Sequence, residues 1–145
     1  RITPLLKDVE KIINSGADIV AYDATNRKRP VPSNEIVSKI KNANRLAMAD
    51  CANLNDAINA VDEGADIIGT TLSGYTGIPV KDTYKPDINL IREFKKLDCF
   101  VMAEGRYNSP ILAKKAILAG ADAVTIGSAI TRIDNITKWF VENVK

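Results

Sequence analysis

The chain contains 145 residues, of which 46% are hydrophobic and 26% are charged. This is ordinary globular composition, and it excludes a disordered, collagen-like or disulfide-rich chain. The net charge of +2 gives no argument for a nucleic-acid or membrane partner. Because the sequence contains no histidine, any proton transfer depends on Glu, Asp, Lys, Tyr or Cys.

No cationic segment followed by an apolar stretch opens the chain, and its apolar runs are far shorter than the ~20 residues of a membrane-spanning helix. We therefore expect a cytoplasmic protein in which Cys51 and Cys99 are reduced thiols. The two cysteines lack the CxxC spacing of a zinc site, so we expect no metal.

A short motif occurs three times and defines the expected architecture. It consists of Gly-Ala-Asp followed by two apolar residues, at 16–20, 64–68 and 120–124. Each copy follows a segment with the periodicity of an amphipathic helix. The glycine suits the left-handed position after a helix, and the apolar run suits a strand that is buried on both faces and therefore parallel.

In chain order, strands are expected near 18–22, 46–49, 66–69, 99–103 and 122–126, each preceded by a helix. This strict alternation predicts an α/β fold with a parallel sheet. Loops are expected at Pro30–Ser33 and Gly74–Lys85, and the second is long enough to be functional. Two architectures fit so far: a doubly wound sheet, and a (β/α)8 barrel whose opening strands are absent.

Polar or glycine-rich sequence follows all five expected strands. Asp23, Asp50 and Glu104 stand at or next to the last strand position. Reacting groups in a barrel lie just after the C-terminal strand ends, so this pattern favours the barrel. The aspartates of the three repeated motifs lie at the opposite strand ends, where we expect structural roles.

Glu104 is the strongest candidate for a catalytic residue. It follows an apolar strand directly and precedes Gly105, a place where a carboxylate seldom stands without a partner. Partial burial would raise its pKa toward the range useful for a general acid or base. An ion pair with Arg106 or Arg132 is an equally good interpretation from spacing alone.

The turns after the last two strands predict an anion site. Gly105 and Gly127-Ser128 leave backbone N–H groups open to a ligand, and barrels frequently bind phosphate at this position. The basic run Arg27–Arg29 after Asp23 is either a solvated loop or a clamp for a substrate anion. Neither GxGxxG nor GxxxxGK[ST] occurs, so the dinucleotide and P-loop fingerprints are absent.

Together these segments resemble the N-acetylmannosamine-6-phosphate 2-epimerase family of bacterial sialic acid breakdown. The matching strings run in order along the chain: Asp23–Pro30, Met48–Asp50, Gly69–Thr76, Ala103–Arg106 and Gly127–Arg132. The resemblance implies a (β/α)8 barrel, of which residues 1–145 form a single partial domain with strands four to eight. The abrupt start at Arg1 agrees with missing N-terminal strands, and we expect the two outer strands to have unpaired edges.

The resemblance also implies the reaction, an interconversion of N-acetylmannosamine 6-phosphate and N-acetylglucosamine 6-phosphate by transfer of the C2 proton, without a cofactor. It assigns catalysis to Glu104 and to a lysine upstream of Ile2. The other residues expected to contact substrate are Asp50, Arg132, Asp23 and Arg27, and those expected to contact its phosphate are Gly105, Arg106, Gly127 and Ser128.

Other functions stay open from the sequence: another phosphosugar isomerase of the barrel class, a sugar-phosphate sensor, or a catalytically inactive barrel fragment. Ketose-phosphate 3-epimerases depend on metal-binding histidines, which this chain lacks. The expected partner is a small N-acylhexosamine 6-phosphate. Exposed strand edges favour association, so we also expect a homodimer.

Overall fold

Five parallel strands form one sheet in chain order. The computed structural model describes residues 2–77 and 85–144, so part of the expected loop Gly74–Lys85 lies outside the described residues. The strands are β1 (Ile19–Asp23), β2 (Leu46–Asp50), β3 (Ile67–Gly69), β4 (Phe100–Glu104) and β5 (Ala123–Thr125). Every neighbouring pair is parallel, and the order β1-β2-β3-β4-β5 contains no reversal. The predicted barrel arc is confirmed, and the doubly wound alternative is wrong.

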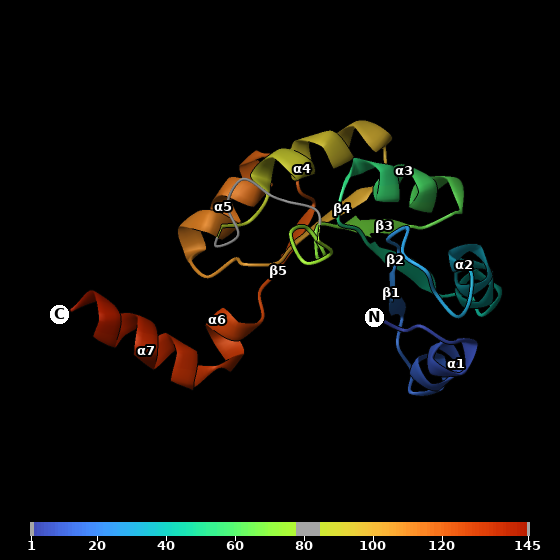
Figure 1. Cartoon of the computed structure of the whole chain (residues 1–145), viewed down its shortest axis with the longest axis horizontal. Helices are drawn as coiled ribbons and strands as arrows, with labels where there is room; N and C mark the ends of the chain where they lie inside the picture. Colours follow the sequence, from blue (N-terminus) through green and yellow to red (C-terminus); the bar gives the residue numbers. More distant parts are fainter. Residues whose placement is uncertain (1, 78–84, 145) are drawn as a thin grey trace.

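Helices alternate with the strands. They are α1 (Leu6–Asn14), α2 (Ser33–Asn42), α3 (Leu54–Asp62), α4 (Ile88–Phe94) with its 3-10 extension η1 (Lys95–Leu97), α5 (Pro110–Leu118), α6 (Ser128–Thr131) and α7 (Ile133–Asn143). Helices α1 to α5 follow one another around the outer side of the sheet, whereas α7 extends away from it (Figure 1). Within the described ranges, no helix has the length and apolar character that crossing a membrane requires.

Local sequence explains where the helices begin and end. Asn53 begins α3 by accepting the N–H of Asp56, and Ser109, followed by Pro110, begins α5. The glycines of the three repeated motifs have φ values of 89°, 96° and 109°, as predicted for the residue after a helix. The motif therefore ends a helix and returns the chain to the sheet.

The hydrophobic core lies between the sheet and its helices. Val20, Ile68 and Val101 point to this side and are fully buried, as are Ile91 and Phe94 of α4. This side is buried because alternate residues of each strand face the amphipathic helices.

The expectation of strands buried on both faces is confirmed only in part. In β3, Ile67 and Ile68 are both buried. On the face away from the helices, however, Ile19, Leu46 and Phe100 are 43%, 45% and 43% exposed. These three side chains begin their strands, so this apolar face is open at the N-terminal end of the sheet.

Two of the three aspartates of the repeated motifs accept backbone hydrogen bonds, as expected for structural residues. Asp66 accepts the backbone N–H of Ala47 at 2.8 Å, and Asp122 accepts that of Val101 at 2.8 Å. Each also pairs with a lysine of the neighbouring helical segment, Lys41 or Lys95. These contacts tie the N-terminal strand ends together, opposite the expected site.

The prediction of two unpaired strand edges is wrong for one end of β1. The carbonyl of Ile2 accepts the N–H of Asp23 at 3.0 Å, and the Thr3 hydroxyl donates to the carbonyl of Ala21 at 2.7 Å. Among the described residues, β5 has a partner only in β4. The segment before α1 thus covers the β1 edge near the expected site.

Replacement of the core residue Ile91 by alanine tests this packing. Because Ile91 is fully buried, Ile91→Ala should lower the free energy of unfolding by about 2–5 kcal/mol. Ile111→Ala removes the same atoms from a residue that is 68% exposed. The free energy of unfolding should therefore change by no more than about 0.5 kcal/mol. Urea denaturation measures both, and equal losses would contradict the assigned core.

Candidate active site

A pocket of about 490 Å³ opens at the C-terminal ends of β3, β4 and β5. Five residues that the sequence singles out line it: Glu104, Gly105, Arg106, Gly127 and Ser128. They converge because parallel strands in chain order place their C-terminal ends on one rim. The pocket is therefore the candidate active site.

Glu104 ends β4 on the same face as Met102, away from the helix-side core. The Thr70 hydroxyl fixes its backbone, since it accepts the Glu104 N–H at 3.1 Å and donates to the Glu104 carbonyl at 2.9 Å. Burial raises the pKa of the Glu104 carboxyl above its usual value, in the direction predicted.

The alternative role for Glu104, an ion pair, finds no support within the described residues. The Arg106 guanidinium donates instead to the carbonyls of Ser73 and Lys85, at 2.8 and 2.9 Å. Arg132 pairs with Asp134 through two hydrogen bonds of 3.0 and 2.7 Å. Both arginines thus have other partners, and Glu104 is a half-buried carboxyl that faces the pocket.

Asp50 ends β2 and is only 3% exposed. The Thr71 hydroxyl donates to its Oδ1 at 2.6 Å. Burial raises the pKa of Asp50 to about 7, and the negative charges of Glu104 and Asp23 act in the same direction, whereas the Thr71 hydrogen bond opposes them. Asp50 is thus a buried carboxyl that titrates near neutral pH, beside the pocket.

Two glycine-containing turns face each other across the pocket. Gly105 and Arg106 both have positive φ, 98° and 65°, and Arg106 lies over the Tyr75 ring with 4.9 Å to its centroid. Gly127 precedes the four-residue helix α6, whose first N–H groups have no partner within the helix. The backbone at these turns is suited to an anionic group.

Asp23 and Arg27 bind each other rather than lining this pocket. The Asp23 carboxylate accepts from Thr25 and from Arg27 Nη2, at 2.5 Å in both cases. Burial would raise the pKa of Asp23, but the hydrogen bonds of Thr25 and the charges of Arg27 and Arg29 hold it below its usual value. Substrate contacts of Asp23, Arg27 and the exposed Arg132 stay predictions.

Several lining residues were not predicted from the sequence. Thr71 and Tyr75 belong to the segment Gly69–Thr76, which resembles the family sequence. The resemblance assigned no site role to either residue. Asn135 and Trp139 come from α7, where no sequence signal pointed to the pocket. Trp139, whose position in the last helix suggests simple packing, is a pocket residue.

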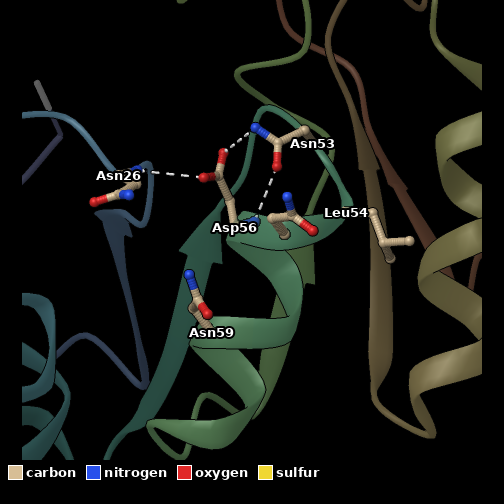
Figure 2. Close-up of a pocket in the computed structure, with 6 residues that line it drawn as sticks. Asn26, Asn53, Leu54, Asp56 and Asn59 are labelled. Carbon is tan, nitrogen blue, oxygen red and sulfur yellow. Dashed lines mark hydrogen bonds between the residues drawn. The ribbon is translucent and has the colours of Figure 1, made fainter.

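A second pocket, of about 470 Å³, lies where α3 begins and is lined mainly by asparagines. The Asp56 carboxylate accepts from the backbone of Asn26 at 3.3 Å and from the side chain of Asn53 at 3.0 Å (Figure 2). It also accepts from the backbone of Ala52 at 3.0 Å. These bonds attach the loop after β1 to the start of α3. None of the predicted site residues lines this pocket.

Cys51 is buried and Cys99 half-buried, and neither forms a disulfide. Burial raises the pKa of both thiols, which disfavours a reactive thiolate. Among residues 2–77 and 85–144, no three His, Cys, Asp or Glu side chains are grouped as metal ligands would be.

The sequence of this chain is similar to those of known epimerases. The family profile described as "Putative N-acetylmannosamine-6-phosphate epimerase" matches residues 1–145. A curated protein of Haemophilus influenzae, named as an N-acetylmannosamine-6-phosphate 2-epimerase, is 52% identical over 145 residues, which are all of this chain and 63% of the relative. The bifunctional enzyme NanE/NanK of Brucella melitensis is 54% identical over 147 residues, which cover all of this chain and 28% of the relative.

A solved structure supports the same relationship. The N-acetylmannosamine-6-phosphate 2-epimerase of Clostridium perfringens superposes with a TM-score of 0.92 at 39% identity, over 97% of this chain and 62% of that one. The chain therefore spans less than two thirds of the length of these relatives.

The raised pKa of Asp50 predicts that Asp50→Asn changes the free energy of unfolding by an amount that depends on pH. A carboxyl whose pKa is higher in the folded state destabilises the fold progressively as pH rises from about 4 to 7. Asn keeps the shape and can accept from Thr71 without ionising. The stability gained by Asp50→Asn should therefore grow between pH 4 and 8, toward an upper bound on the order of 4 kcal/mol. Urea denaturation across this range measures it, and a pH-independent difference would contradict the assignment.

Proposed function

Since this chain belongs to the N-acetylmannosamine-6-phosphate epimerase family, we propose that the protein interconverts N-acetylmannosamine 6-phosphate and N-acetylglucosamine 6-phosphate. The family match over residues 1–145 is the observation that carries this proposal. Under this proposal, the protein is an isomerase that inverts one carbon centre of a phosphosugar.

The chemistry requires movement of a proton that is bound to carbon. In the open-chain sugar, the C2 hydrogen is α to the C1 aldehyde, so its removal gives an enolate. Return of a proton to the opposite face of C2 completes the inversion. The reaction therefore needs groups that take and give protons, and donors that stabilise the enolate oxygen.

Glu104 is suited to one of these proton transfers. It lines the pocket, its backbone is fixed by Thr70, and burial raises its carboxyl pKa toward neutral pH. The second proton-transfer group implied by the family resemblance is a lysine upstream of Ile2. Glu104 would remove or deliver the C2 proton on one face of the sugar, and the lysine would act on the other.

The phosphate of the substrate would bind at the two glycine turns. Gly105 and Arg106 face Gly127 and Ser128 across the same pocket. Backbone N–H groups at such turns can donate to phosphate oxygens without the cost of ordering a side chain. Phosphate at this end would hold the sugar carbons near Glu104.

Four other residues would contact the substrate. Asp50 would hold a hydroxyl or the amide N–H of the substrate. Arg132 would bind a substrate oxygen after its ion pair with Asp134 has opened. Asp23 and Arg27 would contact substrate from the loop after β1. We propose further that the protein is cytoplasmic and homodimeric, and that residues 1–145 belong to a single barrel domain.

The Glu104→Gln variant of the full-length protein tests the catalytic role. Gln keeps the size of the side chain but cannot accept or release a proton at neutral pH. Turnover should fall by ~10²-fold or more, while the affinity for the sugar phosphate should change little. Coupled or NMR assays of the two epimers measure the rate.

Glu93→Gln is the matched control, since Glu93 lies on α4 and pairs only with Lys96 among the described residues. It should leave turnover unchanged. Near-normal turnover of Glu104→Gln would show that Glu104 is structural. An inactive wild-type protein that still binds the sugar phosphate would favour the sensor function instead.

Trp139 provides a direct test of the phosphate site. It lines the pocket with Ser128 and is the single tryptophan of this sequence. N-acetylglucosamine 6-phosphate should change the fluorescence of Trp139, and Trp139→Phe should abolish this response. Ser128→Asp should weaken binding by ~10-fold or more, because its carboxylate repels the phosphate. An undiminished affinity in Ser128→Asp would place the phosphate elsewhere.

A further inference from the structure

Thr71 lies between the two carboxyls of the rim. Its hydroxyl donates to Asp50 Oδ1 at 2.6 Å, and Thr71 lines the same pocket as Glu104. Asp50, Thr71 and Glu104 come from β2, from the turn after β3 and from β4, three neighbouring strands. The Thr71 hydroxyl thus ties the turn after β3 to the end of β2.

The backbone around Thr71 is arranged to permit this contact. A Cβ atom at Gly69 would approach Thr71 Oγ1 to 3.1 Å and Asp50 Oδ1 to 3.4 Å. The missing side chain leaves room for the Thr71 hydroxyl to reach Asp50. The adjacent Thr70 differs, because its hydroxyl bonds the backbone of Glu104 rather than a carboxylate.

We propose that Thr71 is a positioning residue of the epimerisation, whose hydroxyl holds the Asp50 carboxyl in place beside the pocket and orients it toward the substrate. This inference rests on the proposed function. The Thr71 hydroxyl has one hydrogen to donate, and it donates that hydrogen to Asp50 Oδ1. The hydrogen bond therefore fixes the direction of the Asp50 carboxyl and favours its ionised form.

Other titratable groups also lie near Asp50. Asp23 of β1 adds negative charge near Asp50 and is itself held ionised by a lowered pKa. Burial raises the pKa of Tyr22 and of Cys51, and the charge of Asp50 acts in the same direction, so both groups stay neutral. Glu104 is therefore the group whose protonation is coupled most directly to that of Asp50.

Thr71→Val and Thr71→Ser separate the hydroxyl from its methyl group. In the full-length protein, Thr71→Val should lower kcat by about 10- to 100-fold with little change in KM, as expected for loss of a hydrogen bond to a charged group. Thr71→Ser keeps the hydroxyl and should restore kcat to within about 3-fold of wild type. Thr137→Val, which changes an exposed residue of α7, should have no effect.

The pH profile distinguishes positioning from packing. The Thr71 hydrogen bond favours the ionised Asp50 carboxylate, so its loss raises the pKa of Asp50 and should move the acidic limb of kcat to higher pH in Thr71→Val, but not in Thr71→Ser. Titration of ¹³C-labelled Asp50 by NMR should show the same shift without any turnover.

A wild-type kcat and acidic limb in Thr71→Val would overturn the inference, and so would a folded Thr71→Ser with the defect of Thr71→Val. If Thr71→Val fails to fold, Thr71→Ser and the Asp50 titration still decide the question. A wild-type protein without epimerase activity would overturn the proposed function. In that case the NMR titration alone tests whether the Thr71 hydroxyl stabilises the ionised Asp50 carboxylate.

Discussion

The parallel pairing of five strands in chain order is the constraint on which the site depends. Because every strand points the same way, residues that are distant in the sequence meet on one rim. Asp50 pairs with Gly69, Gly69 with Met102, and Glu104 with Thr125. A shift of one residue in any of these registers would move a rim side chain to the helix side of the sheet.

The two rims of the sheet have different chemistry. At the N-terminal rim, Asp66 and Asp122 bind backbone N–H groups and lysines, so their charges are neutralised by structure. At the C-terminal rim, Asp50 accepts from a hydroxyl, and burial raises the pKa of both Asp50 and Glu104. Carboxyls without cationic partners are costly to bury and are therefore typical of functional sites.

The periodicity of the sequence was sufficient to predict the sheet, because the three Gly-Ala-Asp motifs determine where helices end and strands begin. It was also sufficient to place Glu104, Gly105, Gly127 and Ser128 on one rim. Side-chain partners were harder to predict. Nothing in the spacing indicated that Arg106 binds backbone carbonyls or that α7 brings Trp139 to the pocket, since both depend on the directions of loops and of a terminal helix.

The proposed epimerisation requires that the proton at C2 of the sugar be exchanged with solvent. This exchange can be measured by incubating the full-length protein in D₂O with N-acetylmannosamine 6-phosphate and analysing the product by mass spectrometry and NMR. We predict N-acetylglucosamine 6-phosphate that carries one deuterium at C2. Product formed without deuterium at C2 would contradict the account.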